Sequence, residues 1–186
     1  MLLEAALDIF VAQGYHQASM EDIAACAGVS KPVVYQHFDS KRDLYLGLLD
    51  RSVSSVVSGI SEAISRETHN VKRLEAAVSF YFIAVDEADK GYRLIFESDF
   101  TQDNDVRSRV DDVVSQLARI VGREIANETG LTDGEANIVA AGLCGMAQAA
   151  AWRWIRLGRP VSREKAIIGV TLLGWEGLRT FPGSPI

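Results

Sequence analysis

Side chains that could bind an anionic surface gather near the amino terminus, between Ser19 and Phe38. This stretch reads SMEDIAACAGVSKPVVYQHF and brings hydroxyl, amide, imidazole and ammonium groups close together. Such groups bind phosphates and exchange hydrogen bonds with the edges of DNA bases. Helical periodicity would turn one set outward, namely Lys31, Pro32, Val33, Gln36 and His37. The chemistry that these residues suit is therefore contact with a nucleic-acid groove.

Two short helices must position these side chains, and the sequence contains the residues that such a motif needs. Ser19 is the expected N-cap of a helix that Gly28 ends, and Ser30 is the expected N-cap of a second helix. Ala24 is small where the two helices would cross, while Val34 is an apolar anchor on the second helix. This combination predicts a helix-turn-helix. A plain packing corner is the alternative interpretation.

Helical periodicity continues through the rest of the chain, and strand patterns are almost absent. Gly14 is expected to end a first helix, and Ser40 is expected to begin a long one. Further helices are expected at roughly 71–88, 91–99, 104–128, 133–157 and 162–180. The predicted fold class is all-α, with about nine helices.

Length and composition indicate a chain that can build a packed interior. Its 186 residues are 48% hydrophobic and 24% charged, as in folded domains. No secretory leader is expected after Met1, and the apolar run from Ile138 to Trp152 is shorter than a membrane span. Cys26 and Cys144 do not suggest a disulfide framework or a metal site, and Cys26 is expected to be buried. We therefore expect a cytoplasmic protein without a membrane segment.

The charge balance limits how this protein could bind nucleic acid. Its net charge is −6, which argues against a protein that coats nucleic acid by charge alone. Through Arg51, four Lys/Arg residues stand against seven Asp/Glu residues. Binding at this end would use few basic side chains, so its affinity would depend only weakly on salt.

The amino-terminal sequence resembles the TetR family of bacterial regulators. The similarity covers Leu3 to Leu49, through the patterns AxxxFxxxGY, IAxxAGVS and VYxHFxSKxxL. It implies a DNA-binding domain at 1–47 and a helical ligand-binding and dimerisation domain at 48–186. It also implies a homodimer that places the helix at 31–37 in the major groove of a near-palindromic operator. The residues then expected to contact double-stranded DNA are Ser19, Ser30, Lys31, Pro32, Val33, Tyr35, Gln36, His37 and Lys41. Among these, the resemblance assigns phosphate contacts to Tyr35, His37 and Lys41. It assigns base contacts mainly to residues near Lys31, Val33 and Gln36.

Aromatic residues are concentrated between Phe80 and Phe100, in the half that the resemblance assigns to ligand binding. An apolar core is one interpretation. The resemblance favours a second, in which some of these residues line a cavity for a small apolar effector. The candidate lining residues are Phe80, Phe82, Tyr92, Phe96, Phe100, Val113, Leu117 and Met146.

The last two expected helices are apolar on more than one face and contain several glycines. Each glycine inside a helix costs about 1 kcal/mol relative to alanine, and a helix that is apolar all round must be covered all round. The resemblance implies a dimer interface built from these two helices of each subunit. Its expected residues are Gly142, Gly145, Ala149, Trp152, Val170, Gly174 and Gly177. Burial within one subunit is the alternative.

Two segments, 92–99 and 142–148, are similar to the actinobacterial regulators of fatty-acid synthesis within this family. Those proteins sense long-chain acyl-coenzyme A, which is therefore the candidate effector. The family at large favours repression over activation. No catalytic or metal-ligand spacing is found and no cofactor is expected, so an enzyme is not predicted. A helical interaction module that has lost DNA binding remains the alternative function.

Overall fold

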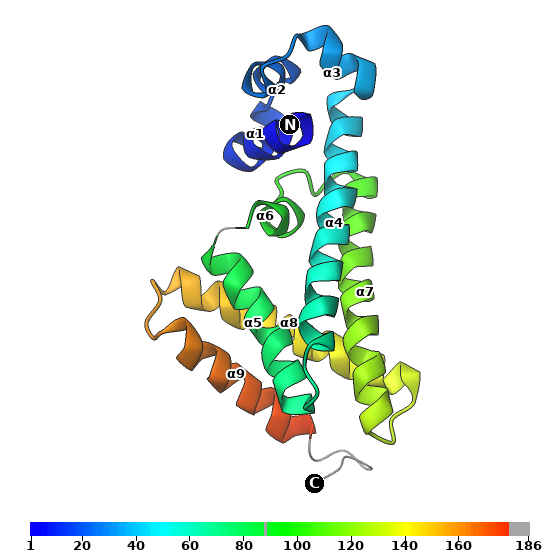
Figure 1. The fold of residues 1–186 in the computed structure, drawn as a ribbon, viewed down its shortest axis with the longest axis vertical. Helices are drawn as coiled ribbons and strands as arrows, with labels where there is room; N and C mark the ends of the chain where they lie inside the picture. Colours follow the sequence, from blue (N-terminus) through cyan, green and yellow to red (C-terminus); the bar gives the residue numbers. More distant parts are fainter. Residues whose placement is uncertain (88, 179–186) are drawn as a thin grey trace. The chain divides into compact units, whose positions relative to one another are not determined.

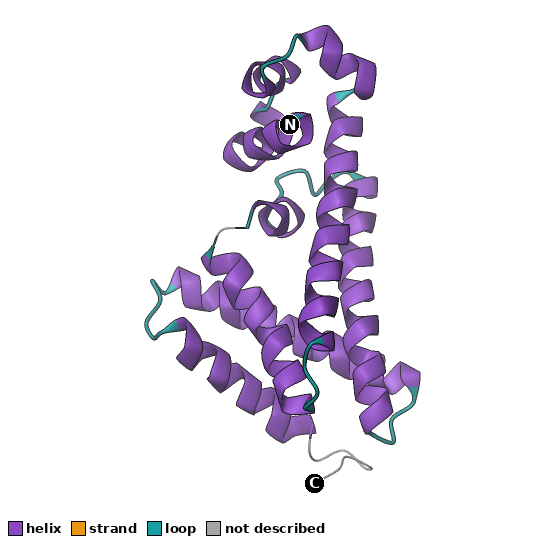
Figure 2. Ribbon diagram, viewed as in Figure 1, coloured by secondary structure: helices purple, strands orange, loops and turns teal. Residues whose placement is uncertain are grey.

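Every regular element of the described residues is a helix (Figure 2). A computed structural model describes residues 1–87 and 89–178. The all-α class predicted from the sequence is confirmed, with nine helices within these residues. They are α1 (Leu2–Gln17), α2 (Met20–Ala27), α3 (Lys31–His37), α4 (Lys41–Ser65), α5 (Asn70–Asp86), α6 (Lys90–Phe96), α7 (Asn104–Glu128), α8 (Asp133–Arg156) and α9 (Arg163–Leu178).

The predicted helix boundaries differ from the observed ones mainly at the carboxyl ends. The helix predicted at 91–99 is α6, which ends at Phe96 because Glu97 leaves the helical conformation. The helices predicted at 71–88 and 162–180 reach residue 88 and residues 179–180, which lie outside the described residues. The boundaries of α7 and α8 agree with the prediction to within one residue.

The described chain forms two compact units, whose helices are labelled in Figure 1. The first contains residues 1–56 and 89–112, and the second contains residues 57–87 and 113–178. The first unit therefore includes α6 and the start of α7, which the sequence had placed in the second half. We describe each unit by itself.

The first unit packs around side chains that recur every three or four positions along its helices. Phe10 of α1, Ile23 of α2 and Val34 of α3 are all at most 3% exposed. Tyr45 of α4 meets the Phe10 ring edge-on, with 5.0 Å between the ring centroids. Burial of such side chains contributes roughly 1.5–3 kcal/mol each, so this shared core fixes the helix-turn-helix against α1 and α4.

Short polar side chains begin several of the helices, as the sequence predicted. The amide N–H of Asp22 donates to Ser19 Oγ at 3.1 Å, and that of Asp43 donates to Ser40 Oγ at 3.1 Å. Thr132 and Glu135 form a reciprocal capping box at α8. Ser30 occupies the N-cap position of α3 but makes no side-chain cap hydrogen bond. Its hydroxyl group is consequently not used to begin the helix.

In the second unit, α5 packs against both α8 and α9. The rings of Phe82 and Trp154 lie 5.6 Å apart between centroids. At the same end of α5, the Asp86 carboxylate pairs with Arg159 at 2.8 Å and with Arg163 at 3.0 Å. These ion pairs attach the turn between α8 and α9 to the carboxyl end of α5.

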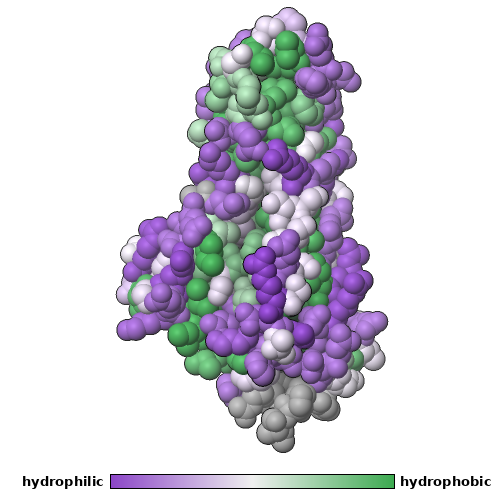
Figure 3. Space-filling model, in the orientation of Figure 1, coloured by the Kyte–Doolittle hydropathy of each residue, from purple (hydrophilic) through white to green (hydrophobic). Residues whose placement is uncertain are grey.

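Large apolar side chains also reach the surface of the second unit (Figure 3). Ile138 of α8 is 74% exposed and Leu173 of α9 is 67% exposed, while Ile168 and Leu172 are each 51% exposed. These four side chains lie on two helices that are consecutive in the chain. Burying such residues is favourable, so this surface is suited to being covered.

Two expectations from the sequence need correction. Cys26 is exposed rather than buried, because it lies outside the buried stripe of α2, which consists of Met20, Ile23, Ala24 and Ala27. The apolar run in α8 was judged too short for a membrane span, but the 24-residue helix passes that test by length and composition. The same composition is found in core and interface helices of soluble folds, so it is weak support for a membrane.

A backbone break inside α1 sets the direction in which the chain enters α2. Gly14 has φ 79° and ψ 166°, which lie outside the helical range. A Cβ atom at this position would lie 2.5 Å from Oδ2 of Asp99. Only glycine combines a positive φ with the absence of a side chain, so the predicted end of the first helix at Gly14 corresponds to a required kink.

Replacing Gly14 by alanine should destabilise the protein, because the new side chain would meet both a strained φ and the Asp99 carboxylate. We expect the free energy of unfolding to fall by about 1–3 kcal/mol. Urea unfolding at one fixed protein concentration measures this change. Gly134→Ala is the control, since a Cβ there meets nothing within 4 Å and its φ is not positive. Equal stability of the two variants would contradict the proposed requirement.

Candidate nucleic-acid interface

The turn between α2 and α3 has the geometry that the sequence predicted. Gly28 adopts the left-handed conformation, with φ 68° and ψ 29°, and its N–H donates to the carbonyls of Ala24 and Ala25. Val34 is fully buried and anchors α3 on the core. The two helices therefore form a helix-turn-helix in which α3 is held by one face and is open on the other.

Most of the residues predicted to contact DNA lie on the open face of α3. Lys31, Pro32, Tyr35, Gln36 and His37 are exposed. Val33 is half-buried, as is Ser19, whose hydroxyl group already caps α2. The exposed side chains of α3 are free to approach base edges and phosphates in a major groove.

Lys31 is engaged by a neighbouring carboxylate on this face. Its Nζ atom donates a hydrogen bond to Oε1 of Glu21, which lies in the first turn of α2. The hydrogen bond raises the pKa of Lys31 and lowers that of Glu21. The same Nζ atom lies 5.8 Å from the centroid of the Tyr35 ring. Lys31 thus joins the two helices of the motif across their outer surface.

Lys41 has a structural role that the sequence did not predict. Its Nζ atom donates to the carbonyl oxygens of Tyr15 at 2.8 Å and Ala18 at 2.9 Å, beyond the kink in α1. It also lies 4.5 Å from the centroid of the Tyr15 ring. The predicted phosphate contact would therefore compete with two carbonyl groups for the same ammonium group.

The segment after α6 completes this support, and the sequence analysis missed it. Asp99 Oδ1 accepts the backbone N–H of Tyr15 at 2.8 Å. Phe100 stacks on the Tyr15 ring with 3.6 Å between centroids. Ser98 Oγ lies 2.6 Å from the hydroxyl oxygen of Tyr45. These contacts join residues 53 to 85 positions apart, so no local pattern could reveal them.

Arg42 ties the start of α4 to the start of α7 within the same unit. Its Nε and one terminal nitrogen donate to the two carboxylate oxygens of Asp103, at 2.8 Å and 3.0 Å. Asp103 also accepts the backbone N–H groups of Asp105 and Val106. The guanidinium group and these N–H groups lower the pKa of Asp103. A bidentate pair of this kind fixes direction as well as distance.

The structure divides the eight predicted ligand-lining residues between the two units. Tyr92, Phe96 and Phe100 lie in the first unit, where Tyr92 and Phe96 are 4.7 Å apart between ring centroids. The other five are in the second unit, namely Phe80, Phe82, Val113, Leu117 and Met146. Phe82, Val113 and Leu117 are buried there. Three of the eight residues thus belong to the first unit and five to the second, and their contact with a ligand stays a prediction.

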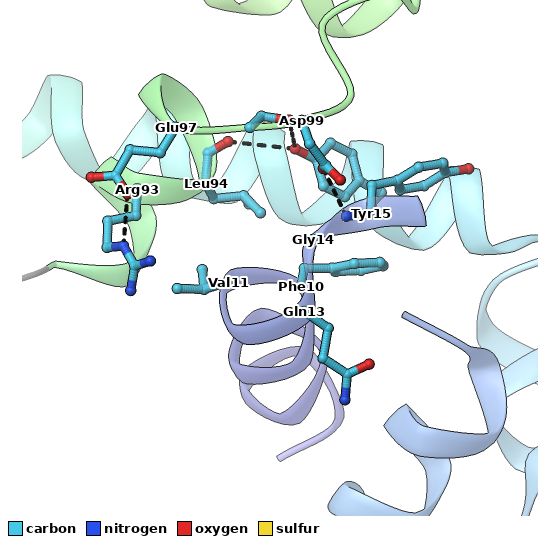
Figure 4. Close-up of a pocket in the computed structure, with 11 residues that line it drawn as sticks. Phe10, Val11, Gln13, Gly14, Tyr15, Arg93, Leu94, Glu97 and Asp99 are labelled. Carbon is cyan, nitrogen blue, oxygen red and sulfur yellow. Dashed lines mark hydrogen bonds and ion pairs between the residues drawn. The ribbon is translucent and has the colours of Figure 1, made fainter. Parts of the chain in front are cut away.

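Each unit also has a cavity that none of the eight residues lines. In the first unit a cavity of about 310 Å³ lies between α1, α4 and α6 (Figure 4). Its lining residues are Phe10, Val11, Gln13, Gly14, Tyr15, Tyr45, Arg93, Leu94, Glu97, Ser98 and Asp99. In the second unit a cavity of about 480 Å³ is lined by Asp86, Trp154 and residues 159–163. Both cavities are bordered by ion pairs, Arg93 with Glu97 and Arg159 with Asp86.

The residues predicted for a dimer interface fall into two groups. Gly142, Gly145, Ala149 and Gly177 are exposed, whereas Trp152 and Val170 are half-buried. Gly174 is instead buried inside the unit, and a Cβ atom there would lie 3.1–3.3 Å from side chains of α5 and α8. The assignment of Gly174 to an outer surface is therefore corrected. The spacing of apolar residues identified two faces of α9 but not which one faces inward.

Comparison with known proteins gives this arrangement a context. Residues 2–48 match a family described as bacterial regulatory proteins of the tetR family. Over 181 residues, the chain is 40% identical to the HTH-type transcriptional activator FasR of Mycolicibacterium smegmatis. That alignment covers 97% of this chain and 83% of the relative.

Solved structures share the fold. A TetR-like transcriptional regulator from Rhodococcus has a TM-score of 0.74 and 24% identity, over 96% of this chain and 94% of that chain. The regulator FadR of Bacillus subtilis, solved in complex with stearoyl-CoA, has a TM-score of 0.74 and 18% identity. That likeness covers 95% of this chain and 97% of the FadR chain.

Alanine at Lys41 should affect folding and DNA binding together, whereas alanine at Tyr35 should affect binding alone. Loss of the hydrogen bonds from a charged donor should lower the free energy of unfolding by about 1–3 kcal/mol. Tyr35 is 42% exposed, so its loss should change stability by less than about 0.5 kcal/mol. Urea unfolding and titration of labelled DNA measure both effects. If Lys41→Ala weakens binding but keeps full stability, Lys41 contacts DNA directly.

Proposed function

Because the chain belongs to the TetR family of bacterial transcriptional regulators, we propose that it binds a near-palindromic DNA site as a homodimer, under the control of an apolar effector. The similarity to FasR, at 40% identity over 97% of the chain, carries this proposal. The open face of α3 supports it, because five of the predicted DNA-contacting side chains are exposed there. We place its action in the cytoplasm, where bacterial DNA is accessible.

The relative supports activation of transcription rather than repression. FasR is named a transcriptional activator, whereas the sequence led us to expect a repressor. At 40% identity, we give the relative more weight than the general tendency of the family. We therefore propose that binding of this protein to its site promotes transcription.

Long-chain acyl-coenzyme A is the proposed effector. FadR of Bacillus subtilis, which shares the fold, was solved with stearoyl-CoA. The second unit of this chain has the apolar interior that an acyl chain requires, since mostly apolar pockets with few polar groups are usual ligand sites. Phe80, Phe82, Val113, Leu117 and Met146 are the residues that we propose to contact the acyl chain.

The exposed apolar surface of α8 and α9 is the proposed dimer interface. It combines Ile138, Ile168, Leu172 and Leu173 with the exposed glycines Gly142, Gly145 and Gly177 and with Ala149. Small residues let two helix backbones approach closely, and the large apolar side chains supply area to bury. A second copy of the same surface would complete a four-helix interface.

Replacing Leu173 by glutamate should convert dimers into folded monomers. The side chain is 67% exposed in one protomer, so the fold should tolerate the charge, whereas a dimer would have to bury it at high cost. Light scattering after size exclusion measures the mass. Leu157→Glu, at a position that is 53% exposed in the turn after α8, is the control and should remain dimeric. A dimeric Leu173→Glu variant would rule out this interface.

Selection of bound duplexes from a random DNA library, with and without long-chain acyl-coenzyme A, tests the function. We expect one near-palindromic sequence to be enriched and its affinity to change with the acyl ligand. An enriched sequence whose affinity does not change with the ligand would support the proposed DNA-binding function and contradict the proposed acyl-coenzyme A effector. Failure to enrich any sequence at low salt would favour the alternative, a helical interaction module without DNA binding.

A further inference from the structure

The ion pair between Lys31 and Glu21 lies on the face that would meet DNA. Both partners are side chains of the helix-turn-helix, Glu21 in the first turn of α2 and Lys31 at the start of α3. Their side chains are 59% and 47% exposed, respectively. Neither residue is needed for the core, which Val34 and Ile23 form on the other side of the motif. The pair is therefore free to open without unfolding either helix.

We infer that Glu21 competes with DNA phosphates for Lys31, so that binding requires this ammonium group to exchange one anionic partner for another. The inference rests on the proposed DNA-binding function and adds a residue that lowers affinity. Glu21 would reduce binding because it occupies the ammonium group in the free protein, so that DNA has to displace it.

The charges of the first unit make this exchange important. Residues 1–56 and 89–112 contain eight Lys/Arg against fourteen Asp/Glu, a net charge of −6. Lys31 is the only Lys or Arg in α3. The other three cations of the first 51 residues are engaged within the protomer: Lys41 by carbonyl oxygens, Arg42 by Asp103, and Arg51 by Glu4. Of the four Lys and Arg residues in the first 51 positions, Lys31 is the one that lies on the exposed face of α3, among the residues predicted to contact DNA.

The pair with Glu21 is weak enough to be exchanged. Exposed ion pairs are screened by water and contribute little to stability. A cation that neutralises a DNA phosphate, in contrast, releases counterions condensed on the DNA, and this release favours binding. The Lys31 ammonium group lies on the outer surface, 5.8 Å from the centroid of the exposed Tyr35 ring. A small movement of the flexible lysine side chain would redirect this ammonium group from Glu21 of α2 towards the DNA groove.

Glu21→Gln tests the inference, with Glu4→Gln as the matched control. Both variants remove one exposed carboxylate from the same unit and from an ion pair, but Glu4 pairs with Arg51 rather than with a residue of α3. For the duplex selected above, we expect Glu21→Gln to bind about two- to fivefold more tightly, the range that an exposed ion pair allows. The plot of log affinity against log salt should steepen by up to about 0.9 per protomer. Glu4→Gln should change neither quantity by a comparable amount.

A double-mutant cycle with Lys31→Ala separates this exchange from a general charge effect. The Glu21→Gln effect should disappear when Lys31 is already alanine, because no cation remains to be released. Equal tightening by both glutamine variants, or persistence of the effect without Lys31, would overturn the inference. So would an altered sequence preference in Glu21→Gln, which would make Glu21 a base contact. If the unchanged protein binds no duplex, the proposed function fails rather than this exchange.

Discussion

The kink at Gly14 is the constraint on which the helix-turn-helix depends. It turns the end of α1 so that the N–H of Tyr15 meets the Asp99 carboxylate, while the following carbonyl groups meet the Lys41 ammonium group. The backbone of residues 15–18 is thus hydrogen-bonded on two sides. The Asp99 carboxylate accepts from its N–H group, and the Lys41 ammonium group donates to its carbonyl oxygens. Because α2 begins three residues after Gln17, this fixed end determines where α2, and through Gly28 also α3, can lie.

The same unit uses its few cations mainly to hold itself together. Arg42 and Lys41 are adjacent in the chain, yet one binds the start of α7 and the other the end of α1. Both bonds position α4, which follows α3 after only three residues. The unit has a net charge of −6, and these two of its basic residues are held by partners within the protomer. In the proposed function, recognition of DNA would use the exposed hydroxyl, amide and imidazole groups of α3 and its single lysine.

The sequence predicted the features that depend on neighbours in the chain. The caps at Ser19 and the anchor at Val34 follow local rules of helix geometry, and the family resemblance supported the same motif. It could not predict the partners of Lys41 and Asp99, because those contacts join segments 23 to 84 residues apart. Nor could periodicity decide that Gly174 faces inward, since α9 has apolar residues on two faces. The side of a helix that becomes its inner face is set by tertiary packing.

In the proposed function, a single α3 helix of seven residues with one lysine would make few phosphate contacts, so one protomer alone would bind DNA weakly. The proposed dimer would bind more tightly, because its second α3 would bind as part of the same molecule at a high effective concentration. Two modest contacts can consequently give a specific complex, provided that their separation matches about one helical turn of DNA. Any change that alters this separation would weaken binding steeply. A protein with little electrostatic attraction to DNA is thus well suited to control by an effector that acts through geometry.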